Sequence, residues 1–239
     1  MKRIFALVTM VSVAVLGLCS QASASFVYSL GVANPGLAGF SGPYGTVTVT
    51  LLDLIHARID FVSNDVGGVS YLFGGRGAFA FNINTDSWSV SEGPFSNRFP
   101  GFTPGPQDQT GTGNEDIFGS FDFRADSMDG YAHAITNASF DITNFGGFWT
   151  SDADVLAPNS LGNYVAAHVF ATTYPANPDI GPLAEGFTTD GSAGNNGVPE
   201  PTSMLLFGLG LAGLGAARRR QKSWSEDESA RFSDRLVRI

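Results

Sequence analysis

The chain has 239 residues, a formal net charge of −9 at pH 7 and one cysteine, Cys19. The span 25–197 is more acidic than the whole chain. It holds four arginines, no lysine and seventeen acidic residues, which gives it a formal charge of −13. This charge argues against nucleic acid as a partner, because phosphates are neutralised by Lys and Arg. The span is long enough for one domain with its own core.

The first 24 residues have the three parts of a secretory signal peptide. Residues 1–3 are basic, 4–18 are largely apolar, and Ala22 and Ala24 form a small-residue cleavage site. We expect an N-terminal signal helix (1–24) that is removed after Ala24, with an uncleaved N-terminal anchor as the alternative. Because Cys19 leaves with this segment, the mature chain has no cysteine for a disulfide or a thiolate metal site.

The following segment alternates apolar and polar residues with a period of two, as strands of a half-buried sheet do. Clusters of Gly, Pro, Asn and Asp separate these strands. The pattern predicts an all-β fold, with an antiparallel β-sandwich or jelly-roll-like body over 25–174. One helical turn is expected within 150–157, with Ser151 as its N-cap. The expected strands are 46–52, 57–62, 78–83, 117–123, 139–143 and 164–171.

Two stretches are too irregular to predict as strands. Residues 92–114 are rich in Pro, Gly and Phe, and we expect a long loop there. Residues 175–197 are poor in apolar side chains and end in a Gly- and Asn-rich run. That composition predicts a flexible stalk after the body.

The chain offers no motif that predicts catalysis. His56, His133 and His168 occur in no zinc-binding spacing, and there is no G-x-S-x-G nucleophile motif. A pair of carboxylates within the acidic stretch 114–130 is the remaining route to an enzyme, one that acts on polysaccharide. We expect a protein that is not an enzyme and uses no cofactor.

Two features suggest binding. Asp126 and Asp129, in the acidic stretch 114–130, are candidate calcium ligands, although the spacing departs from the EF-hand loop and an ordinary turn explains it too. Aromatic residues in the expected loops can stack on sugar rings, or they can cap the ends of the sandwich. These loop aromatics are Phe95, Phe99, Phe102, Phe145, Phe148 and Trp149.

Near the C-terminus, residues 203–217 form an uncharged run of fifteen residues. As a helix it would be about 22 Å long, against about 30 Å for the hydrocarbon core of a membrane. Snorkelling of the following arginines and local thinning of the bilayer can make up the difference. We expect one transmembrane helix, with a buried hairpin of a soluble domain as the alternative. Arg218, Arg219 and Arg220 place its C-terminal end in the cytoplasm.

This region resembles the PEP-CTERM sorting signal of Gram-negative bacteria. The motif residues are Val198, Pro199, Glu200 and Pro201, and the apolar run and the three arginines follow in order within 198–220. The resemblance implies an exosortase-type membrane protease or transpeptidase as a partner, and a bacterium that makes exopolysaccharide. It also implies a β-rich cargo domain without an assigned activity. Unlike most such proteins, the chain continues over 221–239, which we interpret as a charged cytoplasmic tail.

Together these features predict an exported protein that passes through the inner membrane as a transient single-pass intermediate. After exosortase processing it is expected at the cell surface or outside the cell, associated with exopolysaccharide and biofilm. The alternative is a carbohydrate- or calcium-binding module of the extracellular matrix. The expected partners are the exosortase, the membrane and exopolysaccharide, and not nucleic acid.

Overall fold

The computed structural model describes residues 25–105, 108–109, 111–127 and 130–191. The signal peptide with Ala22 and Ala24, the sorting segment 198–220 and the tail 221–239 lie outside this range. Within the described residues, no helix has the length and apolar character that a membrane crossing needs.

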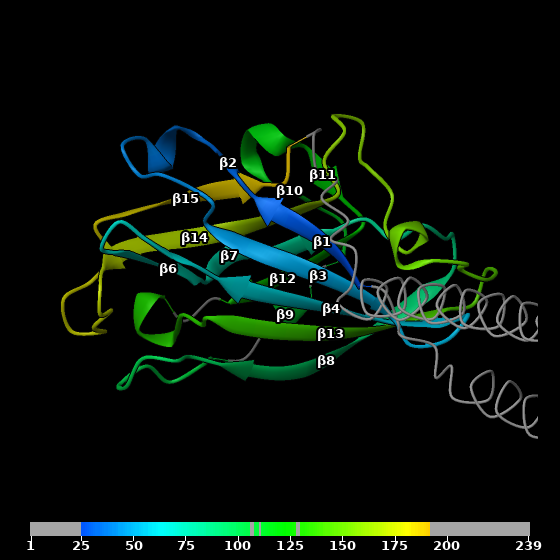
Figure 1. Cartoon of the computed structure of the whole chain (residues 1–239), viewed down its shortest axis with the longest axis horizontal. Helices are drawn as coiled ribbons and strands as arrows, with labels where there is room; N and C mark the ends of the chain where they lie inside the picture. The colour runs from blue at the N-terminus through cyan, green and yellow to red at the C-terminus, as the bar shows by residue number, and fades with distance from the viewer. Residues whose placement is uncertain (1–24, 106–107, 110, 128–129, 192–239) are drawn as a thin grey trace, which may run out of the picture. The chain divides into compact units, whose positions relative to one another are not determined.

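Two antiparallel sheets form the body, one layered on the other (Figure 1). The five-stranded sheet has the order β1-β3-β4-β13-β8. Its strands are β1 (Ser25–Leu30), β3 (Gly45–Leu51), β4 (His56–Ser63), β13 (Asn137–Asn144) and β8 (Trp88–Ser96).

The second sheet has eight strands, and its main path runs β2-β15-β14-β7-β12-β9. Strand β6 pairs with β14 beside β7, and β5 pairs with β6. The bounds are β2 (Val32–Ala33), β15 (Ala184–Thr189), β14 (Val165–Thr173), β7 (Gly75–Phe81), β12 (Phe123–Ser127), β9 (Asp108–Gln109), β6 (Val69–Phe73) and β5 (Asp65–Val66).

A short hairpin and four 3-10 turns complete the described part of the chain. The hairpin pairs β10 (Gly113–Asn114) with β11 (Ser120–Phe121). The turns are η1 (Pro35–Leu37), η2 (Asp116–Phe118), η3 (Tyr131–His133) and η4 (Asp152–Asp154). The last of these confirms the helical turn expected within 150–157. Ser151 is its N-cap residue by position, but its side chain makes no capping hydrogen bond.

The core lies between the sheets and is dominated by phenylalanine. Phe61 of β4 lies 4.8 Å from Phe79 of β7 between ring centroids, and Phe79 lies 5.4 Å from Phe140 of β13. All three rings are fully buried. Full burial of a phenylalanine side chain stabilises the fold by about 1.5–3 kcal/mol. This packing explains why the strands with the clearest alternation were predictable.

The expected all-β fold with antiparallel sheets is confirmed, and five of the six expected strands overlap β3, β4, β7, β13 and β14, with ends that differ by up to three residues. The sixth, 117–123, is wrong as one strand. Its first residues belong to η2, and Gly119, with a φ of +90°, turns the chain before β11. The chain bends at Asp122 between β11 and β12.

Both stretches expected to be irregular contain strands. The predicted loop 92–114 includes the end of β8 as well as β9 and β10. The predicted stalk 175–197 includes β15, which pairs with β14 over six residues. The body therefore extends past residue 174. Strand β15 was not predicted because its buried positions hold Gly186 and Thr188, where a recognisable strand would have large apolar side chains.

Candidate functional site

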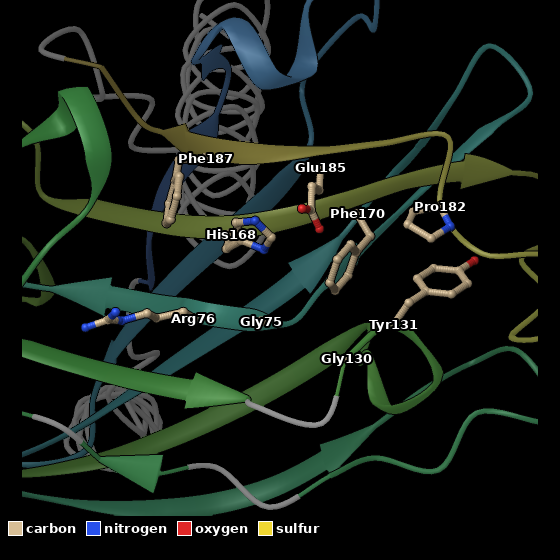
Figure 2. Close-up of a pocket in the computed structure, with 9 residues that line it drawn as sticks. All are labelled: Gly75, Arg76, Gly130, Tyr131, His168, Phe170, Pro182, Glu185 and Phe187. Carbon is tan, nitrogen blue, oxygen red and sulfur yellow. The ribbon is translucent and has the colours of Figure 1, made fainter.

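A groove of about 560 Å³ lies on the outer face of the eight-stranded sheet, the face turned away from the core (Figure 2). Part of this outer face is covered, because Phe121 of β11 packs on Ala80 and Ala166. The groove lies on the same outer face, next to the part that Phe121 covers. Its lining residues are Gly75, Arg76, Gly130, Tyr131, His168, Phe170, Pro182, Glu185 and Phe187.

Four rings form a row along the groove, which we call the aromatic row: Tyr131, Phe170, His168 and Phe187 (Figure 2). Successive ring centroids are 5.5, 5.2 and 4.9 Å apart, each pair in an edge-to-face arrangement. The register of the sheet produces the row. His168 and Phe170 are two residues apart on β14 and share a face, and Phe187 of β15 is directly opposite His168.

His168 is held in one orientation by the backbone of the neighbouring strand. Its Nδ1 lies 2.6 Å from the carbonyl oxygen of Gly74, which can only accept a hydrogen bond, so Nδ1 carries the proton. Burial lowers the pKa of His168 below its usual value, although the hydrogen bond to Gly74 opposes this. The ring is therefore neutral at pH 7, and its Nε2 is a hydrogen-bond acceptor.

The close approach of His168 depends on glycine at position 75. Gly75 has a φ of +78°, in the left-handed region that residues with a Cβ rarely adopt. A Cβ built there would lie 2.9 Å from Nδ1 of His168. A larger residue at position 75 would therefore displace the ring.

One cation and one anion line the groove. Arg76 of β7 and Glu185 of β15 are both exposed, and Figure 2 shows them on opposite sides of His168. Among the described lining residues these two charges cancel, within a body whose formal charge is strongly negative. It presents guanidinium donors, carboxylate acceptors and apolar ring surface together.

A second polar cluster is buried instead of open, and it contains the calcium candidate Asp126. Arg124 donates two hydrogen bonds to the Asp126 carboxylate, at 2.7 and 2.9 Å, and the backbone N–H of Gly77 donates a third at 2.6 Å. Burial raises the pKa of Asp126, but these hydrogen bonds outweigh it and hold the pKa below the usual value. Asp129, the other candidate, lies outside the described residues.

Glu115 completes this cluster and is 1% exposed. Its Oε1 lies 3.4 Å from Nε of Arg124, and neither carboxylate oxygen accepts a hydrogen bond. Burial raises the pKa of Glu115 to about 7. Across the described residues, His, Cys, Asp and Glu side chains form no group of three suited to a metal ion. The arrangement is that of an internal ion cluster held by an arginine.

Comparison with known protein families decides what the C-terminal region is. The family model described as the PEP-CTERM protein-sorting motif matches residues 197–220. The chain carries a PEP-CTERM sorting motif. It is therefore an exported substrate of an exosortase-type membrane enzyme, anchored transiently in the membrane and destined for the cell surface or the exterior. No curated protein matches the chain, and no solved structure does.

The match contains the residues expected to direct the sorting of this PEP-CTERM protein. Val198, Pro199, Glu200 and Pro201 lie near its start, and Arg218, Arg219 and Arg220 end it. The match covers the sorting segment and leaves the β-sandwich body unassigned. The body's activity must be inferred from its own surface.

The loop aromatics of this exosortase substrate are mostly structural. Phe99, Phe102 and Trp149 are buried, and Phe95 lies in β8 and packs against the core. Two remain exposed in the loop after β13, Phe145 at 65% and Phe148 at 74%.

Sequence reasoning missed the groove in part because two of its four rings, His168 and Phe170, lie on β14, a strand whose aromatic residues were expected to fill the core. The missed signal was in β14 itself. Its core-facing residues, such as Ala167 and Ala171, are small, and the larger His168 and Phe170 point the other way. The three histidines do lie in or beside strands as expected: His56 begins β4, His168 lies in β14, and His133 ends η3 ahead of β13.

Proposed function

We propose that the body of this exported protein associates with the exopolysaccharide of the cell surface and catalyses no reaction. The sorting motif at 197–220 supports the association, because it directs the protein to the cell surface or the exterior, which is the compartment of an exopolysaccharide. The groove supports the association as well, since it combines apolar ring surface with separated donors and acceptors.

The non-catalytic role is supported by the carboxylates of the groove. Glycoside hydrolysis ordinarily needs two carboxyl groups that flank the scissile bond. Glu185 is the one carboxylate among the lining residues described by the structure. The buried Glu115 and Asp126 do not line the groove, and each forms an ion pair with Arg124.

Cell fractionation tests sorting and matrix association together. An epitope tag between Gly67 and Gly68, in the exposed turn between β5 and β6, stays with the body after both ends are processed. We expect the tagged body in the matrix fraction of cells that have an exosortase, and in the inner membrane of cells that lack it. Glu200→Gln should retain the chain in the inner membrane, and Glu226→Gln in the tail serves as the matched control.

Two outcomes would count against this function. If the body stays in the inner membrane with its tail intact in both strains, exosortase sorting is wrong. If the body is released but appears entirely in the cell-free medium, sorting stands and association with exopolysaccharide is wrong.

A further inference from the structure

We propose that the groove lined by the aromatic row is the site at which the body holds exopolysaccharide, and that it takes an uncharged chain of hexopyranose rings with equatorial hydroxyls. This inference rests on the proposed association with exopolysaccharide and adds to it a site and a ligand class. Its parts are Arg76, Tyr131, His168, Phe170, Glu185 and Phe187.

The aromatic row explains the preference for sugar rings of this shape. A pyranose whose hydroxyls are equatorial presents a flat face of C–H groups, which packs against aromatic carbon. Tyr131, His168 and Phe187 are half-buried, so each keeps part of its surface open toward the groove, whereas Phe170 is 4% exposed and supports its neighbours from below. The three partly open rings are tilted relative to one another, by 69° between His168 and Phe187, so each offers its own patch of aromatic carbon to a successive sugar of a polymer.

The polar groups around the row match hydroxyl groups. A hydroxyl both donates and accepts hydrogen bonds, so it needs partners of both kinds. Arg76 offers donors only, whereas Glu185 and the neutral His168, through Nε2, offer acceptors. Figure 2 shows Arg76 and Glu185 on the two sides of the His168 ring. A polymer that lies along the row and extends past His168 therefore meets the Glu185 acceptor on one side and the Arg76 donor, whose guanidinium points away from His168, on the other (Figure 2).

The charge of the body selects a neutral polymer. The span 25–197 has a formal charge of −13, so an anionic polysaccharide meets long-range repulsion. A single arginine in the groove, accompanied by Glu185, does not reverse this field. An uncharged chain is not repelled, and its binding should depend little on salt.

The position of the groove on the sheet argues against a peptide as its ligand. Extended peptides commonly bind by adding a strand to a free sheet edge. Strand β14, which forms the floor, is paired with β15 on one side and with β6 and β7 on the other. Its backbone is therefore occupied, and side chains alone are left to hold a ligand.

The test is binding of the full-length protein to exopolysaccharide of the producing organism, separated by anion exchange into neutral and acidic fractions. Calorimetry in a detergent without a sugar headgroup measures the affinity. We expect binding to the neutral fraction, weakened about two- to twelvefold by Phe187→Ala, since one aromatic contact is worth about 0.5–1.5 kcal/mol. Arg76→Ala should weaken it about threefold, because an exposed side chain makes a modest hydrogen-bond contribution.

Matched controls lie outside the groove. Phe148→Ala removes an equally large and more exposed ring, and Arg58→Ala removes an exposed arginine of the other sheet, paired with Asp141. Both should bind like the unmodified protein. Thermal unfolding checks the fold of each variant. Because Arg76 is exposed, its variant keeps the test informative if Phe187→Ala unfolds the body.

The outcomes separate the site from the function it rests on. Equal binding by the groove and control variants would leave the association with exopolysaccharide standing and overturn the groove assignment. Preference for the acidic fraction would overturn the ligand class. If neither fraction binds, the site and the association both fail, whereas exosortase sorting is judged by fractionation alone.

Discussion

Replacing Glu115 by glutamine should remove a large part of the pH dependence of stability. The folded chain raises the pKa of this carboxyl from 4.5 to about 7, chiefly by burial. A carboxyl with a raised pKa binds its proton more tightly in the folded state. Its favourable contribution is therefore complete below pH 4.5 and is lost as the pH rises toward 7. At about 1.4 kcal/mol for each pKa unit, the loss is about 3 kcal/mol.

The charges that face Glu115 define what the substitution changes. Arg124 lies against it, Asp126 shares that arginine, and Arg76 acts on it from β7. Glutamine has the shape of the neutral acid and cannot ionise. The Glu115→Gln variant should resemble the unmodified protein near pH 4.5 and be more stable at pH 8 by up to about 3 kcal/mol.

Urea unfolding of the mature protein from pH 4.5 to 8.5 provides the measurement. The difference in unfolding free energy between variant and unmodified protein isolates Glu115, since other titrating groups cancel. Those groups include Asp190, whose pKa is raised to about 6 by burial, and His168, whose pKa is lowered. Asp86→Asn removes an exposed carboxylate and is the control. A difference that stays constant between pH 4.5 and 8 would refute the reasoning.

Two further substitutions test the packing, both by urea unfolding. Gly77→Ala should destabilise the body by more than about 2 kcal/mol, because the new Cβ would lie 1.9 Å from Oε2 of Glu115 at a φ of +71°. Gly111 has a φ of +69° and open space around it, so the control Gly111→Ala should lower the free energy of unfolding by about 1–2 kcal/mol. Equal losses for the two variants would contradict the predicted clash with Glu115. Phe140→Ala should cost about 3–5 kcal/mol, since its ring is fully buried, whereas the exposed Phe148→Ala should stay within about 0.5 kcal/mol. Similar losses for both would mean that Phe140 does not contribute to the core as described.

The strands that could be predicted are those in which one face is apolar and the other polar. In β3, Val47 and Val49 are fully buried and the intervening Thr48 is not, so the alternation of apolar and polar residues in the sequence predicts this strand correctly. Strand β15 could not be predicted in this way. Its buried Gly186 meets the turn η1, and its buried Thr188 donates a hydrogen bond to the carbonyl of Val32.

The groove and the ion cluster were hidden for a different reason. Both depend on residues that are far apart along the chain. Tyr131 of η3 meets Phe170 of β14 in the groove, and Gly77 of β7 donates a hydrogen bond to Asp126, 49 residues away, in the ion cluster. No local pattern records such pairings. The sorting motif, by contrast, is local in sequence, which is why its function could be assigned from the residues alone.

The pairing of β2 with β15 determines when this protein can finish folding. Val32, close to the start of the β-rich body, pairs with Thr189, close to the end of that body. An exported chain that crosses the membrane from its N-terminus brings β2 across first. Strand β2 then has no β15 to pair with until almost all of the body has crossed. The sheet is completed when residue 189 emerges, directly before the sorting segment arrives. Because the sorting segment comes after residue 189, a chain anchored through that segment already has its last strand available to complete the sheet.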